Sequence, residues 1–532
     1  MPECFLSADG LSCRLPDGKL LFENVSFSLS KGEKAALTGD NGVGKTTLLK
    51  MLTGLIEPDK GSVRFSGKIS VLPQNPDFGT ASVPEVLGVR ERLEALKRIE
   101  NGDTDAALFD IIGKNGWDLA ARLENECRAF GLPDRVLSSV FRTLSGGERE
   151  KVLLIRQFLS DAPVLIFDEP TNNLDESGKM LFYNKISETR RTVLIVSHDR
   201  ELLERMDCLF ELDKNGIKRF GGNYSFYKTQ KSSERAAAES KKADLEKECR
   251  RLKSSCLRIV SQSASKARAG KKAVRNNRIL PIQAHEMKSA AQASLGGKIK
   301  IATEKLEKAQ EEAGNLSLAL KEDRIKIPLP AKPFLRDVLL ESENIVFGYG
   351  GRLLFNGFSF KMKGGERVRI RGANGAGKTT LIRLMLGGLS PDSGKAVLNG
   401  RAVYLDQSLS LLDGEKTLID NVIDLNEGIK TTDAYAILAN FGFKNVSAAK
   451  AVKTLSGGEL LRASMAAVLG TPDQPDLIIF DEPTNNLDIK SVEVLEEALK
   501  SWQGALIVVT HDGKFAESLK CSRDIFLLPP PC

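Results

Sequence analysis

One ordered set of motifs occurs twice in the chain, and this repetition constrains the fold more than any other feature of the sequence. The repeated motifs are GxxxxGKTT at 39–47 and 372–380, LSGGE at 144–148 and 455–459, IFDEPTNNLD at 166–175 and 479–488, and (S/T)HD at 197–199 and 510–512. A chain of 532 residues is too long for one hydrophobic core. The repeat therefore predicts two similar domains.

The GxxxxGKTT motifs predict two phosphate-binding loops, each between a buried strand and a helix. Their glycines let the backbone turn its N–H groups toward phosphate at a helix N-terminus. Lys45 and Lys378 can reach the β- and γ-phosphates of a nucleotide, and the hydroxyls of Thr46 and Thr379 can bind Mg²⁺. The expected nucleotide-binding residues of the two loops are Gly39, Asn41, Gly42, Gly44, Lys45, Thr46, Thr47, Gly372, Asn374, Gly375, Gly377, Lys378, Thr379 and Thr380.

The IFDEPTNNLD motifs predict buried parallel strands that end in two carboxylates. Asp168 and Asp481 stand at the strand end, where a carboxylate can enter the coordination shell of Mg²⁺. Glu169 and Glu482 follow directly and can orient or deprotonate an attacking water. Because both copies keep the glutamate, we predict that both sites hydrolyse nucleotide.

The order of these motifs resembles that of the ATP-binding cassette (ABC) ATPases, in which LSGGE is the signature sequence. The resemblance covers about 5–225 and 338–528. It implies an α/β fold of two P-loop NTPase cassettes, each with a helical subdomain, that close head to tail around two ATP molecules. It also implies further site residues: Gln74 and Gln407 near Mg²⁺ and the γ-phosphate, Ser145 and Gly147 over the nucleotide of Lys378, Ser456 and Gly458 over that of Lys45, Asp175 and Asp488 across the interface, and the switch histidines His198 and His511.

The two copies differ where the family places an aromatic side chain on the adenine ring. Tyr349 fits this position in the second copy, whereas alignment of the copies puts Arg14 or Leu15 there in the first. We therefore expect weaker adenine binding at the first site.

The basic residues of the chain are concentrated between the two copies. Residues 231–330 carry a local charge of +11 within a formal net charge of +7. Apolar residues spaced by three and four, from Leu245 to Ile259 and from Ile299 to Leu320, predict two helices packed as an antiparallel hairpin with its tip near 265–285. The tip carries the cations that we expect to contact an RNA backbone: Lys266, Arg268, Lys271, Lys272, Arg275 and Arg278.

Twin cassettes, a long helical linker and the stretch GNYSFYKTQK at 222–231 resemble the F subfamily of ABC ATPases (ABC-F). We divide the chain into a first cassette (1–224), a basic helical hairpin (225–330) and a second cassette (331–532). The resemblance implies a cytoplasmic monomer without a membrane domain, which pairs its own cassettes and binds the exit-tRNA site of the ribosome in the ATP-closed state. Its linker would contact rRNA and tRNA near the peptidyl-transferase centre, and residues 85–140 of the first copy would form an arm that contacts the ribosome.

Several alternatives stay open at this stage. A run of cations is often only a solvated helix face, and residues 85–140 fit an enlarged helical subdomain as well as an arm. The same architecture serves antibiotic-resistance proteins that protect the ribosome and DNA-associated tandem ABC ATPases, whereas a tandem importer subunit would need no basic hairpin. The eight cysteines form no CxxC pair, which favours a reduced, cytoplasmic protein. Iron–sulfur recycling relatives need a cysteine-rich N-terminal domain, which Cys4 and Cys13 do not supply.

Overall fold

The computed structural model describes residues 4–15, 18, 20–74, 76, 78–113, 116–275, 300–301, 303–315, 337–470, 474–485 and 487–528. The chain divides into one unit that contains both cassettes, Met1–Tyr227 with Lys326–Cys532, and a second unit, Lys228–Ile325. Within the described ranges, no helix combines the length and the hydrophobicity that a membrane span requires.

The first cassette is built on a mainly parallel sheet whose described strands follow the order β5-β6-β7-β3-β8-β9. Strands β6 and β7 are fully buried runs of Val, Leu, Ile and Phe, as expected for parallel strands covered on both faces. A separate antiparallel sheet has the order β2-β1-β4. The strands are β1 (Cys4–Arg14), β2 (Leu20–Ser30), β3 (Lys34–Thr38), β4 (Lys60–Phe65), β5 (Ile69–Leu72), β6 (Val164–Asp168), β7 (Thr192–Val196), β8 (Cys208–Asp213) and β9 (Gly216–Phe220).

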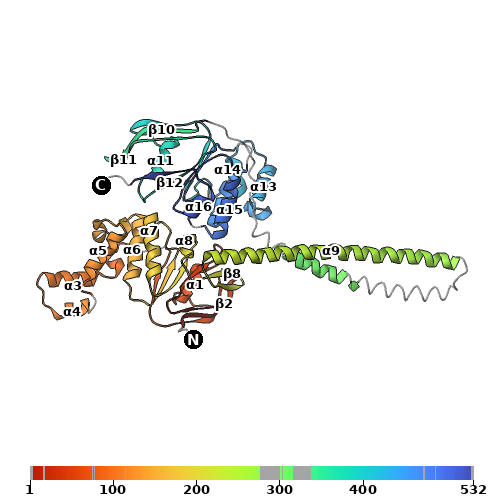
Figure 1. Cartoon of the computed structure of the whole chain (residues 1–532), viewed down its shortest axis with the longest axis horizontal. Coiled ribbons are helices and arrows are strands. Elements are labelled where there is room, and N and C mark those ends of the chain that lie inside the picture. Colours follow the sequence, from red (N-terminus) through yellow and green to blue (C-terminus); the bar gives the residue numbers. More distant parts are fainter. Residues whose placement is uncertain are drawn as a thin grey trace. The chain divides into compact units, whose positions relative to one another are not determined.

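The helices of the first cassette form a larger subdomain than those of the second. Its described helices are α1 (Lys45–Leu52), α2 (Val83–Leu87), α3 (Arg90–Glu100), α4 (Ala106–Ile112), α5 (Leu119–Ala129), α6 (Gly146–Leu159), α7 (Glu176–Glu188) and α8 (Arg200–Leu203), with 3-10 turns at Asp134–Ser138 and Phe141–Thr143. The extra residues of the first copy form the pair α3–α4 (Figure 1). Phe109 and Trp117 lie on its surface, with ring centroids 5.7 Å apart and exposed fractions of 45% and 52%.

The second cassette repeats this plan. Its mainly parallel sheet has the order β14-β15-β16-β12-β17, and its antiparallel sheet the order β11-β10-β13. The strands are β10 (Leu340–Tyr349), β11 (Arg352–Met362), β12 (Arg367–Gly372), β13 (Ser393–Leu398), β14 (Ala402–Leu405), β15 (Leu477–Asp481), β16 (Ala505–Val509) and β17 (Arg523–Leu527). The helices are α11 (Lys378–Met385), α12 (Leu418–Asp424), α13 (Thr431–Asn440), α14 (Gly457–Leu469), α15 (Ile489–Ser501) and α16 (Gly513–Ser518), with 3-10 turns at Asn445–Ala449 and Val452–Thr454. The structure therefore has the α/β fold of two P-loop cassettes.

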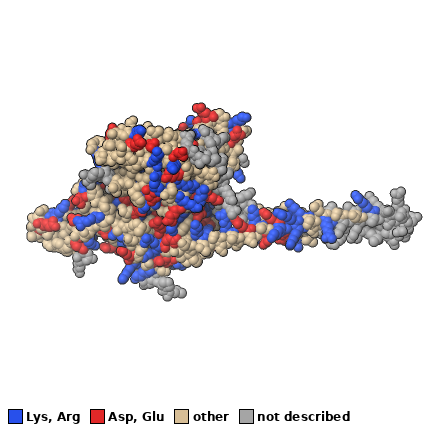
Figure 2. Space-filling view, turned by 45° about the horizontal axis from the view of Figure 1, so that its top comes forward, with Lys and Arg blue, Asp and Glu red and all other residues tan. Residues whose placement is uncertain are grey.

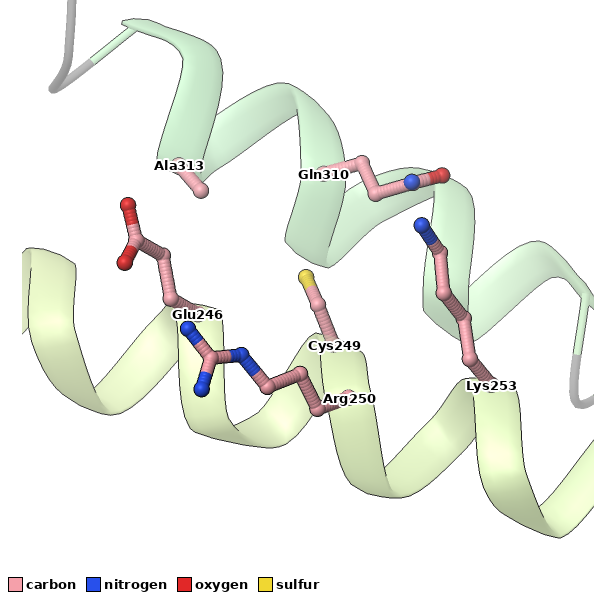
Figure 3. Close-up of a pocket in the computed structure, with 6 residues that line it drawn as sticks. All are labelled: Glu246, Cys249, Arg250, Lys253, Gln310 and Ala313. Carbon is pink, nitrogen blue, oxygen red and sulfur yellow. The ribbon is translucent and has the colours of Figure 1, made fainter.

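The second unit contains most of helix α9 (Tyr224–Arg275) and a helical segment at 300–315 that runs beside it (Figure 1). Leu245, Cys249 and Leu252 are half-buried on α9, and Ala309 of the returning segment is 7% exposed. In Figure 3, Cys249 points from α9 toward the returning helix, with Ala313 on the opposite side. The apolar spacing of the sequence thus coincides with the faces that meet between these two helices.

Candidate active sites

The phosphate-binding loops place their lysines over the turn that precedes each helix. Nζ of Lys45 donates hydrogen bonds to the carbonyls of Gly39 (2.7 Å) and Asp40 (3.2 Å). Gly44, the residue before α1, has φ of 103°, and a Cβ atom there would lie 2.6 Å from Leu21 Cδ2. Only glycine fits this position without strain. The loop therefore turns its backbone N–H groups and the Lys45 ammonium toward one place.

The second loop has the same geometry. Nζ of Lys378 donates to the carbonyl of Gly372 (2.8 Å) and lies 3.1 Å from Nε2 of His511. Gly377, before α11, has φ of 89°. The remaining predicted residues occupy equivalent positions in the two copies. Asn41, Gly42, Asn374 and Gly375 lie in the turns before the helices, and Thr47 and Thr380 lie in the first turns of α1 and α11.

A threonine and an aspartate meet beside each loop, as a magnesium site requires. Thr46 Oγ1 donates to Asp168 Oδ2 (2.8 Å), and Thr379 Oγ1 donates to Asp481 Oδ2 (2.9 Å). These are hard oxygen ligands, and Mg²⁺ uses one or two of them together with substrate phosphates and waters. The residues present therefore fit the metal, and in both cassettes they come from the first turn of a helix and the end of a buried strand.

The two candidate catalytic glutamates have a strained backbone. Glu169 and Glu482 have φ of 52° and 50°, in the left-handed region that non-glycine residues rarely adopt. Each carboxylate oxygen Oε1 lies 3.4 Å from Nε2 of the switch histidine of its own cassette, His198 or His511. The strain and the contact aim each glutamate into the space beside the phosphate-binding loop.

Burial controls the charge of these groups. It raises the pKa of Glu169 to about 8 and that of Glu482 to about 7, while the nearby lysines of the loops oppose the rise. Burial also lowers the pKa of His198 and His511 to about 3, so both imidazoles are neutral. Among the described residues, Glu482 Oε1 is buried and accepts no hydrogen bond, which leaves it available to a water.

Residues of one cassette complete the site of the other. Asp488 Oδ2 accepts a hydrogen bond from the backbone N–H of Asn41 (3.0 Å), and Nδ2 of Asn374 donates to the carbonyl of Asn173 (2.7 Å). A Cβ atom on Gly147 would lie 2.6 Å from Asn374 Nδ2, so the first LSGGE motif is close to the second phosphate-binding loop. The head-to-tail arrangement is therefore visible in the contacts of the two cassettes.

The two LSGGE motifs each begin a helix. Ser145 and Ser456 cap α6 and α14, and each side chain shares a capping box with the glutamate three residues later, Glu148 or Glu459. Gly147 and Gly458 follow within the first turn. The serine hydroxyl and the first N–H groups of such a helix can donate hydrogen bonds to phosphate.

The second site has an open cavity, of about 520 Å³, that contains several of the predicted residues. Its walls include Tyr349 together with Gln407, Lys378, Thr379 and Glu482. Tyr349 is 52% exposed at the mouth, where a base can stack on it. In the first cassette Gln74 is exposed, and so is Leu15, the residue that follows strand β1.

Sequence reasoning missed two side chains of the second site. Tyr404 of β14 donates from its hydroxyl to Asp481 Oδ2 (2.9 Å), the oxygen that also accepts from Thr379. The ammonium of Lys179 of α7 opposes the rise in the pKa of Glu482 that burial causes. A position-by-position comparison of the two copies would have signalled both, because Val71 and Val492 stand at the equivalent positions.

The predicted RNA-contacting cations lie in the last residues of α9 and just beyond it in the sequence. Arg268 is exposed on this helix; Lys266, Lys271, Lys272 and Arg275 lie in its backbone range without described side chains, and Arg278 is outside the described residues. Figure 2 shows basic side chains gathered on the described part of the hairpin. The exposed ones include Arg250, Arg251, Lys253 and Arg258.

Comparison with known proteins identifies the cassettes. The family model described as ABC transporter matches residues 22–172 and 355–485. "Tylosin resistance ATP-binding protein TlrC" of Streptomyces fradiae is 31% identical over 96% of this chain and 95% of its own length. "Energy-dependent translational throttle protein EttA" of Escherichia coli K12 is 32% identical over 95% of this chain and 89% of its own.

Solved structures show the same fold at lower identity. An archaeal ABCE1, described as a ribosome recycling factor in complex with the ribosomal stalk protein aP1, superposes with a TM-score of 0.57. It is 19% identical and covers 96% of this chain and 86% of its own.

Proposed function

This chain belongs to the ABC family and, within it, to the F subfamily, so it is an ATPase, and we propose that it is a ribosome-associated translation factor. The cassettes would close around two ATP molecules, the closed chain would bind the ribosome at the exit-tRNA site, and hydrolysis would release it. The basic hairpin would modulate translation by contacting rRNA, or the tRNA that carries the nascent peptide, near the peptidyl-transferase centre. The contacts of Gly147, Asn173 and Asp488 with the phosphate-binding loop of the opposite cassette carry this proposal.

Each site would use its own residues in distinct roles. Lys45 and Lys378 would hold the β- and γ-phosphates, and Thr46 with Asp168, or Thr379 with Asp481, would hold Mg²⁺, which supplies charge neutralisation when bound. Glu169 and Glu482 would orient the attacking water. The helix N-termini at Ser145 and Ser456 would donate to the γ-phosphate from the opposite cassette, so that catalysis depends on closure.

The hairpin supports an RNA partner. A helix of 52 residues extends about 78 Å, since each residue adds about 1.5 Å. Exposed cations such as Arg250, Arg251 and Lys253 line its described part. Such a surface favours binding to a polyanion such as RNA through contacts with its phosphate backbone. The relative from Escherichia coli is named for translation, and the one from Streptomyces fradiae for tylosin resistance.

The test is sedimentation of the Glu169→Gln/Glu482→Gln variant with ribosomes. If ATP closes the cassettes and hydrolysis reopens them, this variant should stay on ribosomes in ATP, whereas the parent should dissociate. Equal retention of the two chains would reject the proposed cycle. Growth of expressing cells with and without tylosin distinguishes the two functions that the names of these relatives suggest. Protection from tylosin favours ribosomal drug resistance, and its absence favours a translation factor.

The contribution of the hairpin can be measured by its salt dependence. Neutralising Lys266, Arg268, Lys271, Lys272, Arg275 and Arg278 should flatten the fall of ribosome affinity with salt, by about 0.7 in the logarithmic slope for each lost phosphate contact. Lys361 and Lys395, exposed on the antiparallel sheet of the second cassette, provide the matched control. If the control flattens the slope as much as the hairpin variant, the hairpin is not the RNA-binding element.

A further inference from the structure

Helix α9 begins inside the cassette unit, where its first turn is tied to the first cassette. The backbone N–H and the hydroxyl of Ser225, the second residue of α9, both donate to the carboxylate of Glu204 (3.3 and 2.5 Å). The hydroxyl of Tyr227 donates to Glu211 Oε1 of β8 (3.1 Å), and its ring centroid lies 4.9 Å from that of Phe220 in β9. The start of the linker helix is thereby fixed to the first cassette at two places.

A lysine of the second cassette meets the same carboxylate. Nζ of Lys514, in α16, donates to Glu204 Oε1 (3.1 Å), and the two side chains are 35% and 25% exposed. The ammonium also lies 5.6 Å from the ring centroid of Tyr224, the first residue of α9, which is 4% exposed. A cation over an aromatic ring at this distance is attracted to it. Lys514 thus contacts both the carboxylate that holds α9 and the residue with which α9 begins.

The two helices that meet at this junction each follow a switch histidine. Asp199, directly after His198, caps the start of α8, and Glu204 is the C-cap of the same helix. Asp512, directly after His511, caps the start of α16, which carries Lys514. The first turn of α9 therefore lies where the segments that follow the two switch histidines meet.

Helix α8 contacts the second cassette along its whole length. Arg200, its first residue, pairs with Glu496 of α15 (2.6 Å). A Cβ atom on Gly513 of α16 would lie 3.2 Å from Glu201 Oε1, so the backbone of α16 approaches α8 closely. Glu204 ends this row of contacts. All three depend on the pairing of the cassettes, because each joins one cassette to the other.

We propose that Lys514 is a positioning residue that couples the pairing of the cassettes to the start of the linker helix. In the paired state its ammonium holds Glu204 and Tyr224 from the second cassette and restrains the first turn of α9. When the cassettes separate, this restraint is lost, while Ser225 and Tyr227 keep their bonds to the first cassette. The inference rests on the ATP-driven closure of the proposed function.

The test is hydrogen–deuterium exchange of the backbone amides of residues 224–230 in the Glu169→Gln/Glu482→Gln chain, without ribosomes. In this parent chain, saturating ATP with Mg²⁺ should slow the exchange about fivefold, because closure adds the contacts of Lys514. Lys514→Met should leave the exchange without ATP unchanged and remove the slowing by ATP. Lys514→Arg should keep most of the slowing, since the guanidinium also bears a positive charge.

A matched control is Lys490→Met, which removes another lysine of the second cassette that pairs with a carboxylate of the first. Lys490, in α15, pairs with Asp40 of the first phosphate-binding loop (3.1 Å). This variant should keep the slowing by ATP at residues 224–230. Each chain is measured at saturating ATP, so that a changed ATP affinity does not enter the comparison.

Four results would overturn the inference: exchange in the parent chain that ATP does not slow, a Lys514→Met chain that keeps the slowing, a Lys514→Arg chain that loses it, or a Lys490→Met chain that loses it as fully as Lys514→Met. Sedimentation with ribosomes is measured separately. A parent chain that stays on ribosomes in ATP without slowed exchange would reject the coupling alone. Loss of both effects would reject the proposed ATP cycle as well.

Discussion

Breaking the ion pair between Arg200 and Glu496 tests whether this pair holds the two cassettes together. Arg200 lies in α8 of the first cassette and Glu496 in α15 of the second, with Nη1 and Oε1 2.6 Å apart and side chains 7% and 10% exposed. Glu496→Leu leaves the guanidinium buried without its carboxylate while the cassettes are closed, whereas opening returns it to water. The substitution should therefore weaken closure more than it destabilises either cassette.

The size of the effect follows from the burial of the pair. Removing one partner of a buried ion pair costs about 3–5 kcal/mol. Because this pair lies at an interface that can open to water, we take the lower end, about 3 kcal/mol. Because two ATP molecules bind to the closed state, the cost divides between them. The binding free energy of each ATP falls by about 1.5 kcal/mol, which raises its apparent Kd about tenfold.

The assay is equilibrium ATP binding to the Glu169→Gln/Glu482→Gln chain with and without Glu496→Leu. Arg200→Met together with Glu496→Leu should recover part of the lost affinity, because it removes both charges. The control Glu126→Gln breaks the pair with Lys185 within the first cassette. The side chain of Glu126 is 25% exposed and that of Lys185 is 21% exposed. This control should lower the free energy of unfolding by up to about 1 kcal/mol and leave ATP affinity unchanged.

Two outcomes would refute the reasoning. If Glu496→Leu lowers the urea midpoint of the second cassette and leaves ATP affinity unchanged, the pair stabilises a fold and not the closed state. If the double substitution binds ATP no better than Glu496→Leu alone, the loss does not arise from the unpaired guanidinium.

Two further predictions concern single sites. Tyr404→Phe removes the hydroxyl that donates to Asp481, so the Mg²⁺ concentration for half-maximal turnover should rise severalfold, for a loss of about 1 kcal/mol; an unchanged Mg²⁺ requirement would argue against a role for this bond. Gly44→Ala should lower the free energy of unfolding of the first cassette by about 2 kcal/mol or more, because φ is 103° and Cβ would meet Leu21. Gly42→Ala, at φ of 77° with no heavy atom within 4 Å of the new Cβ, should lose about 1 kcal/mol, and equal losses in urea unfolding would show that the contact with Leu21 is unimportant.

The sequence by itself determined the parts of the protein that depend on local chemistry. GxxxxGKTT requires a glycine turn before a helix, and a run such as IFDE is apolar until the carboxylates at its end. The duplicated order of motifs then sufficed to predict the twin α/β cassettes and the cations between them. The turns and strands can be predicted from the sequence because each depends on residues only a few positions apart.

Only the tertiary structure decided which side chains meet across the pairing of the cassettes. Nothing in the sequence near Asn173 relates it to Asn374, from which it is separated by 201 residues along the chain. This proximity arises because the two similar domains pack head to tail, so that the residues before α7 and α15 meet the opposite phosphate-binding loop. Tyr404 meets Asp481 within one cassette, because β14 and β15 are neighbours in its sheet. Burial between the domains then gives the Arg200–Glu496 ion pair a stronger attraction than it would have in water.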